Sequence, residues 1–179
     1  DLRTTNNGDI KVVVEDGTLR VKPGADGDPA VDANGTGDIL VDVREIGNDI
    51  VFDGGIQTDT GNIELHAADD IDINASVQTG GSGAIYLRAD NNALTDTAPS
   101  GIDGIDVSGT ITTASGDVYI TATTVNGNVR INSDISTSGT ADSHGDVALV
   151  AGDDVLLNAD ITTGFGDVLF NAANGTVEN

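Results

Sequence analysis

The sequence repeats a short string in which Gly and Asp precede Ile or Val. With its near variants, the string stands at residues 8–10, 37–39, 61–63, 83–85, 116–118, 145–147 and 166–168. These seven starts lie between 21 and 33 residues apart, which indicates a repeat architecture. A unit this short cannot bury its own apolar face, so it must stack on its neighbours.

The shortest unit, residues 146–167, shows what one repeat contains. Residues 147–151 alternate between apolar and polar or variable positions, which is the pattern of a half-buried strand. The Gly-Asp-Asp string at 152–154 is typical of a turn, and a second alternating stretch covers 155–163. The unit is therefore predicted to be a short strand, a turn, a longer strand bent near Ala159 and Asp160, and a turn.

The other units keep this alternation in the same register, including one inward position that holds only a small residue. That position is occupied by Gly54, Ala75, Gly109, Ser133 and Ala159. Identical units stack, with each strand pairing with its equivalent about 4.7–4.9 Å away. We therefore predict an all-β fold: a right-handed parallel β-helix, or β-solenoid, of about seven coils of roughly 21–24 residues. The right hand follows the usual handedness of parallel connections.

The domain organisation follows from the same register. Residues 1–179 form a single solenoid, interrupted by insertions near 22–35 and 90–104. Residues 1–4 match the last strand of a coil and residues 168–177 match a unit broken midway, so we expect a segment of a longer solenoid. Seven coils would make a rod on the order of 33 Å long.

The composition limits the classes of molecule that the chain can bind. The chain has 7 Lys and Arg against 30 Asp and Glu, 26 of them Asp, and a formal net charge of −23. This charge argues against nucleic acid and anionic lipid, because Lys and Arg are needed to neutralise phosphates. No apolar run reaches the ~18 residues of a membrane span, so we expect no membrane insertion. The absence of Cys excludes disulfides and thiol chemistry. We expect a monomer whose acidic surface keeps the rods apart.

Two stretches carry a family resemblance. Residues 113–120 (Thr-Ala-Ser-Gly-Asp-Val-Tyr-Ile) and 152–163 (Gly-Asp-Asp-Val-Leu-Leu-Asn-Ala-Asp-Ile-Thr-Thr) resemble the stalk repeats of filamentous-haemagglutinin-like proteins and related giant secreted bacterial adhesins. The likeness covers nearly the whole chain. It implies a right-handed β-helix, secretion to the bacterial cell surface, and a non-catalytic role as stalk or adhesion segment. Through its parent protein, such a segment would reach a host or neighbouring cell surface, or a glycan.

The first insertion is the best discrete metal candidate. Asp26, Asp28, Asp32 and Asn34 place oxygen ligands at two-residue steps around a Gly, a pattern that can wrap one Ca²⁺. The match to an EF-hand loop is poor, because the terminal Glu and the flanking helices are missing. A solvated acidic loop is the alternative, and Ca²⁺ is the one cofactor that the sequence suggests.

Acidic residues also form two columns along the predicted rod. One follows each Gly of the repeat, and the other precedes the longer strand at Asp49, Asp70, Asn128 and Asp154. Stacked carboxylates about 5 Å apart repel, so their cost must be offset. Asx capping of backbone N–H groups is one explanation, and Ca²⁺ bridging between coils is the other. Asn62 and Asn128 favour capping, because they replace Asp without disturbing the register.

Tyr86 and Tyr119 occupy the same outward column of adjacent coils, so we expect their rings to stack on one face. That pair is a possible glycan contact, although cross-strand aromatic pairing also stabilises ordinary sheets. The alternative function is therefore a carbohydrate-binding or carbohydrate-cleaving β-helix module. His66 and His144 fall in non-adjacent coils without a Gly-x-Ser-x-Gly motif, and we interpret them as isolated surface residues.

Overall fold

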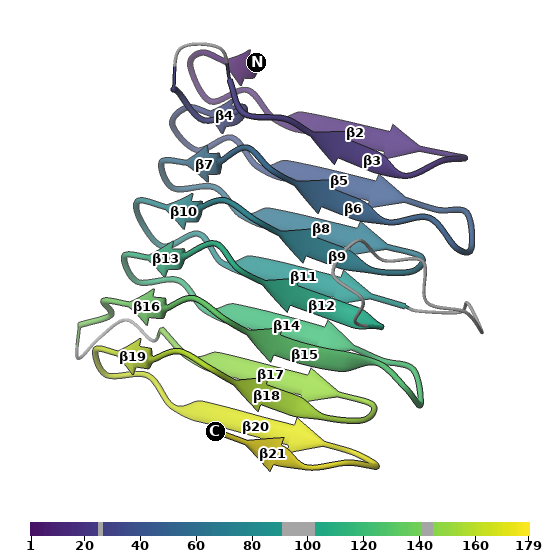
Figure 1. Ribbon diagram of the computed structural model, residues 1–179. Helices are drawn as coiled ribbons and strands as arrows, with labels where there is room; N and C mark the ends of the chain where they lie inside the picture. Colours follow the sequence, from purple (N-terminus) through teal and green to yellow (C-terminus); the bar gives the residue numbers. More distant parts are fainter. Residues whose placement is uncertain (25–26, 91–102, 141–144) are drawn as a thin grey trace.

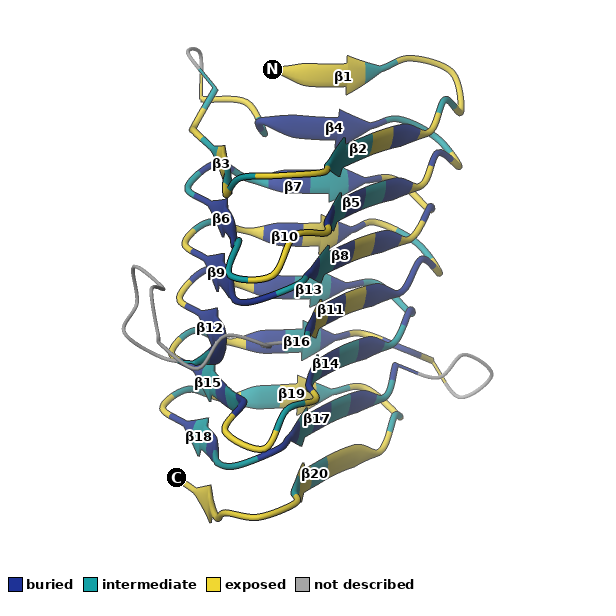
Figure 2. Ribbon diagram, turned by 90° about the vertical axis from the view of Figure 1, so that its right-hand side faces the viewer, coloured by how far each residue is buried: buried dark blue, intermediate teal, exposed yellow. Residues whose placement is uncertain are grey.

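The computed structural model describes residues 1–24, 27–90, 103–140 and 145–179. Within these ranges the chain forms strands β1 to β21 and no helix. The chain winds into seven stacked coils, with the two termini at opposite ends (Figure 1). Seen from the N-terminal end, the coils descend clockwise, so the solenoid is right-handed (Figures 1 and 2). The predicted parallel β-helix of about seven coils is confirmed.

Each coil contributes one strand to each of three sheets, and each strand pairs in parallel with its equivalent in every adjacent coil. The β1 sheet contains β1 (Leu2–Thr4), β4 (Val31–Ala33), β7 (Ile56–Thr58), β10 (Val77–Thr79), β13 (Ile111–Thr113), β16 (Ile135–Thr137) and β19 (Ile161–Thr163). The β2 sheet contains β2 (Ile10–Val14), β5 (Ile39–Val43), β8 (Ile63–Ala67), β11 (Ile85–Ala89), β14 (Val118–Ala122), β17 (Val147–Ala151) and β20 (Val168–Ala172). The β3 sheet contains β3 (Leu19–Val21), β6 (Ile50–Phe52), β9 (Ile71–Ile73), β12 (Gly104–Val107), β15 (Asn128–Ile131), β18 (Val155–Leu157) and β21 (Val177–Glu178).

The longer strand of each repeat is bent into two strands that belong to different sheets. In the shortest unit, β18 and β19 are separated by residues 158–160, where the sequence predicts the bend. The small inward residue lies at this corner, and the reason is visible at Gly109. A Cβ there would stand 2.0 Å from the carbonyl oxygen of Ala75 in the preceding coil. The backbone turns too close to its neighbour for a larger side chain.

The core is one continuous column of inward Ile, Val, Leu and Ala side chains. Between coils two and six these residues are nearly all buried, and Phe52 is the largest side chain among them. Exposure rises at the two terminal coils (Figure 2). Because each inward residue stacks on an equivalent one, apolar contact continues along the whole axis rather than around a single centre.

Threonine provides the polar part of this core. An inward Thr ends every β1-sheet strand except β4, which ends in Ala33, and several of these Thr hydroxyls donate to a Gly carbonyl oxygen at the next corner. Thr79 donates to Gly83 over 2.8 Å, and Thr163 donates to Gly166 over 2.7 Å. A buried hydroxyl needs such a partner, which is consistent with the Thr that stands three or four residues before Gly8, Gly61, Gly83, Gly116 and Gly166.

The Gly and Asp that define the repeat act on the adjacent coil. A Cβ at Gly116 would lie 1.8 Å from the carbonyl oxygen of Gly83, so this corner admits only Gly. The following Asp accepts the backbone N–H of its equivalent in the next coil: the Asp167 amide donates to Asp146 Oδ1 over 2.8 Å. Asn62 accepts the Ala84 amide in the same way over 2.9 Å. The capping prediction is confirmed, but the capped amide belongs to the next coil rather than to the same turn.

No helix of the described residues is long and apolar enough to cross a membrane.

Candidate functional site

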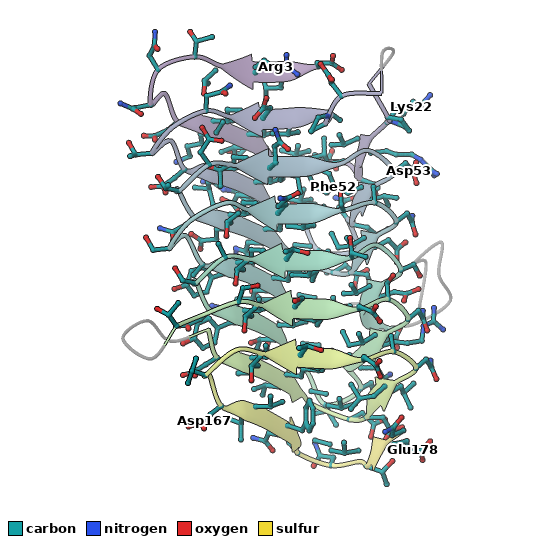
Figure 3. All side chains as sticks on the ribbon, turned by 90° about the vertical axis from the view of Figure 1, so that its left-hand side faces the viewer. Arg3, Lys22, Phe52, Asp53, Asp167 and Glu178 are labelled. Atoms are coloured by element: carbon teal, nitrogen blue, oxygen red, sulfur yellow. The ribbon has the colours of Figure 1, made fainter. Side chains whose placement is uncertain are left out.

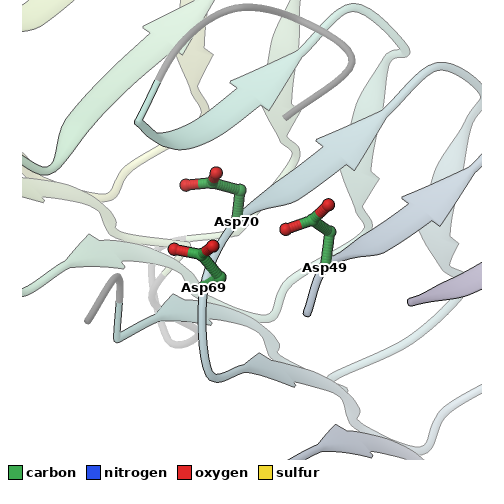
Figure 4. A group of neighbouring side chains, drawn as sticks. All are labelled: Asp49, Asp69 and Asp70. Atoms are coloured by element: carbon green, nitrogen blue, oxygen red, sulfur yellow. The ribbon is translucent and has the colours of Figure 1, made fainter. Parts of the chain in front are cut away.

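Three carboxylates meet at the corner between the β2 and β3 sheets (Figure 4). Asp49 directly precedes β6, and Asp69 and Asp70 directly precede β9 in the next coil. Each offers an oxygen, these atoms lie within 4.8 Å of one another, and all three residues are buried. The repeat register brings Asp49 and Asp70 together, because their strands pair as Ile50 with Ile71. We call these three residues the carboxylate cluster.

Burial changes the acidity of this cluster. Desolvation raises the pKa of Asp70 to about 8, and the charges of Asp69, Asp49 and Asp103 push the pKa in the same direction. The Gly104 amide, which donates to Asp70 Oδ1 over 2.5 Å, opposes the rise. Asp70 is therefore largely protonated near neutral pH, and its proton relieves the repulsion between neighbouring carboxylates.

The cluster can accept either a proton or a hard cation. Carboxylate oxygens from two adjacent coils are the ligands that Ca²⁺ prefers, and a cation bound there would join those coils. The raised pKa of Asp70 describes the alternative, in which a proton supplies the missing positive charge. Asp49 and Asp70 belong to the column predicted from the sequence, whereas the column does not include Asp69. The Asp-Asp doublet before β9 is the sequence signal for Asp69.

In the first insertion, the predicted metal ligands that the structure describes contact other groups of the chain. Asp26 lies outside the described residues. Asp28 and Asp32 come together around Arg3, which contacts their carboxylate oxygens at 3.0 and 3.2 Å. The Asn34 amide nitrogen donates to the carbonyl oxygen of Thr4 over 2.7 Å. A fixed guanidinium thus stands between two of the predicted ligands, and the Ca²⁺ assignment stays a prediction.

Tyr86 and Tyr119 stack as the sequence predicts. Their ring centroids lie 5.2 Å apart with an interplanar angle of 6°. Beside them lies a shallow hollow of about 300 Å³, which Glu64, Arg88 and Thr121 also line. The Tyr119 hydroxyl donates to Asp117 Oδ2 over 3.1 Å, and burial together with that carboxylate raises the pKa of Tyr119. The hollow therefore offers aromatic edges, a carboxylate and a guanidinium on one outward face.

His66 is not the isolated residue that its sequence position suggested. Its imidazole lies between Asp42 of the preceding coil, 3.4 Å from Nδ1, and Asp90 of the next coil, 2.9 Å from Nε2. Arg88 and Arg44 complete the row by contacting Asp90 and Asp42, each at 2.8 Å. Burial opposes ionisation of Asp90, but His66 and Arg88 outweigh it, so the pKa of Asp90 is lowered. His144 lies outside the described residues.

Three outward residues of the β3 sheet are buried, although the alternating pattern predicts that they are exposed. Outward side chains are expected to be solvated, yet Val51, Asp72 and Asp106 are 1%, 3% and 7% exposed. Arg130 forms two hydrogen bonds to Asp106 across adjacent coils. This face, next to the carboxylate cluster, is therefore partly buried over coils two to four.

The geometry defines the class of protein as a three-sided parallel β-solenoid with polar ladders along its axis. Comparison with family models, with curated proteins and with solved structures gives no match for the chain. The resemblance to filamentous-haemagglutinin-like stalks thus remains a prediction from the sequence.

Proposed function

We propose that this chain is a non-catalytic structural stalk or adhesion segment of a large secreted bacterial surface protein. In that role it projects a distal binding region toward a host cell, a neighbouring cell or a glycan. The observation that carries the proposal is the unbroken axial register: all three sheets run through all seven coils. A solenoid of this kind transmits position along its axis, because each coil contacts only its neighbours.

The side-chain ladders support a mechanical role. Asp and Asn side chains cap amides of the next coil, as between Asp9 and Asp38 at 3.0 Å. On the β3-sheet side, Asn158 donates to Asn132 over 2.9 Å, which adds an amide ladder of the kind that stabilises stacked strands. These bonds point along the rod, so they resist separation of the coils.

A display experiment tests the stalk role. The chain is placed between a bacterial outer-surface anchor and a reporter domain that binds a known ligand, either as one copy or as two copies in tandem. We expect the reporter to stand further from the cell in the tandem version, and the chain without its reporter to bind neither cells nor glycans. Binding or glycan cleavage by the chain alone would contradict the proposal.

A second candidate function is carbohydrate binding, which the tyrosine stack favours. Tyr86 is 41% exposed beside the hollow, so a sugar ring has an aromatic surface with Glu64 and Arg88 in reach. A glycan array and a turnover assay separate this function from the stalk. If it is correct, Tyr86→Ala abolishes array binding while Phe165→Ala, which removes another exposed ring, leaves binding intact. An array without signal rejects it.

A further inference from the structure

Four Asn-Gly pairs occur in the chain, at residues 7–8, 34–35, 126–127 and 174–175. This pair is chemically reactive, because the Gly nitrogen can attack the side-chain amide of the Asn, and Gly has no side chain that blocks the approach. The attack needs an Asn side chain that can rotate and a Gly amide that can lose its proton. The structure treats the four pairs differently in both respects.

At three of the pairs, the Asn side chain is held by an adjacent coil. The bonds join Asn7 Oδ1 to the Thr36 amide at 3.0 Å, Asn34 Nδ2 to the Thr4 carbonyl oxygen at 2.7 Å, and Asn174 Nδ2 to the Gly152 carbonyl oxygen at 2.8 Å. At the second pair the Gly35 amide is bound as well, because it donates to Asp59 Oδ2 over 2.7 Å. These contacts between coils must open before the side chain can rotate, so they slow the attack.

Asn126 is the exception, at the tip of the turn between β14 and β15 in the fifth coil (Figure 1). It is exposed, the preceding Val125 is 72% exposed, and within the part of the chain that the structure describes no hydrogen bond holds the Asn126 side chain. The Gly127 amide donates to the Thr124 carbonyl oxygen over 3.0 Å inside the same turn. This bond can open at the exposed tip without separating two coils. The Asn126 side chain can therefore reach the Gly127 nitrogen.

The same turn also supplies a donor that favours the attack. Asn128 Nδ2 donates to the carbonyl oxygen of Asn126 over 3.0 Å. The carbon of this carbonyl is bonded to the Gly127 nitrogen, so when that nitrogen loses its proton, resonance places part of the negative charge on the carbonyl oxygen. A hydrogen bond to a charged oxygen is stronger than one to a neutral oxygen. Asn128 therefore lowers the cost of deprotonating Gly127.

We propose that Asn126 is a site of spontaneous deamidation. The deprotonated Gly127 nitrogen attacks the side-chain carbonyl carbon of Asn126, the new C–N bond closes a succinimide ring, and the side-chain nitrogen takes a proton from water and leaves as ammonia. A second water then opens the ring. Its addition to the side-chain carbonyl gives Asp, and its addition to the backbone carbonyl gives isoaspartate. The net reaction consumes water, releases ammonia and needs no other reactant.

The modification changes the charge of the rod without changing its register. Each product carries one more negative charge at the edge of the fifth coil, and isoaspartate adds one carbon to the backbone of the turn. Val125 and Asn126 lie outside the core, so we expect β14 and β15 to keep their pairing. The inference goes beyond the stalk role and does not depend on it.

Peptide mapping by mass spectrometry tests the proposal on the whole chain, kept folded at mildly alkaline pH. We expect Asp and isoaspartate to accumulate at residue 126 about tenfold faster, or more, than at residues 7, 34 and 174, where a bond must open first. In denaturing urea the four pairs should react at similar rates, because the coils that hold three of them are gone. If any other pair reacts as fast as Asn126 in the folded chain, the proposal is wrong. The same ranking in urea would also overturn it, since sequence rather than structure would then set the rates.

A single substitution tests the donor in the turn. Asn128→Asp keeps the Oδ1 acceptor that caps the Asp154 amide over 3.0 Å, but it removes the donor to the Asn126 carbonyl oxygen. We expect the reaction at residue 126 to slow about tenfold in the folded chain and to change little in urea, where the turn is absent. Asn171→Asp is the matched control, because it adds the same charge at an exposed position of β20 and should leave the rate unchanged. Equal rates for the two variants in the folded chain would refute the role of Asn128.

Discussion

Single residues in this chain are constrained mainly by the coil next to them. Gly116 does not need a left-handed backbone; it needs the absence of a Cβ, because the carbonyl oxygen of Gly83 stands where that atom would be. The same closeness makes Asp70 unusual, because its equivalent Asp49 and its neighbour Asp69 crowd it inside the protein. Substitutions at Gly116 and Asp70 test these two effects of the neighbouring coil.

Gly116→Ala should be strongly destabilising. The new methyl group would meet backbone at 1.8 Å, so the two coils must separate locally. We expect the Tm to fall by on the order of 5–10 °C, since 1 kcal/mol corresponds to about 2–4 °C in a domain of this size. The matched control is Gly55→Ala, whose Cβ would come no closer than 3.2 Å to another atom, the Ser76 hydroxyl oxygen. Equal losses in Tm for both variants would contradict the account.

Asp70→Asn should change how stability depends on pH. The pKa of Asp70 rises from 3.8 to about 8 on folding. Folding therefore takes up a proton between pH 3.8 and about 8. The contribution of Asp70 to stability is fully present below pH 3.8, where the carboxyl is neutral in both states, and it is lost as pH rises through about 8. Asn keeps an oxygen for the Gly104 amide without the charge. We expect Asp70→Asn to raise the Tm at pH 9 by on the order of 5 °C and to have little effect at pH 5.

The exposed variant Asp16→Asn controls for net charge and should leave the slope of Tm against pH unchanged. Recording the same curves in EDTA and in millimolar Ca²⁺ separates a proton from a cation. We expect equal Tm values in both at neutral pH, because the proton on Asp70 relieves the repulsion. A higher Tm in Ca²⁺ would mean that the carboxylate cluster binds the metal.

At the scale of strands and turns, stability comes from ladders that repeat once per coil. The Asp column shows what the ladder requires: an acceptor oxygen at the right reach, not a charge, since Asn62 fills one position and accepts the Ala84 amide. Asp predominates because its short side chain reaches the next coil. Caps of this kind at Asp9, Asp38, Asp117 and Asp146 contribute to the excess of Asp over Glu in the chain.

Asp146 provides the test of this ladder. Asp146→Asn keeps the acceptor for the Asp167 amide, so we expect a Tm close to that of the parent chain. Asp146→Ala leaves that amide without its acceptor and should cost about 1 kcal/mol, or roughly 2–4 °C in Tm. Urea melts followed by circular dichroism give the free energy of unfolding, and thermal melts give the Tm. If Asn is as damaging as Ala, the charge matters and the ladder explanation fails.

At the scale of the whole molecule, the repeat register predicts most of the fold. The seven starts coincide with the seven strands of the β2 sheet, and the bend near Ala159 separates two sheets. The register also predicts the stack of Tyr86 on Tyr119. These features follow because equivalent residues stack on one another, so the pattern of a single unit defines the position of each residue in every coil.

What the sequence does not predict are contacts between unlike residues at equivalent positions. Asp42, His66 and Arg88 share one outward column, yet their ion pairs depend on rotamers and on Asp90 in a turn. The carboxylate cluster is predicted only in part, because the column contains Asp49 and Asp70 but indicates neither Asp69 nor the burial of the cluster. Alternation marks the outward residues of the β3 sheet as solvated, whereas Val51 and Asp72 are buried beside it. Burial of that face is a tertiary property that no single repeat encodes.

The most direct test of the central claim, that each strand pairs with its equivalent in the next coil, is disulfide trapping. The chain has no Cys, so introduced pairs react without competition. Gln78 of β10 and Thr112 of β13 are paired outward residues of adjacent coils. At the spacing of parallel strands their Cα atoms lie about 4.8 Å apart, which is within reach of a disulfide. Gln57 and Thr112 lie two coils apart, at roughly 9.6 Å, beyond that reach. We expect Gln78→Cys with Thr112→Cys to form an intramolecular disulfide under mild oxidation, and Gln57→Cys with Thr112→Cys to keep both thiols free. The reverse result would contradict the solenoid register.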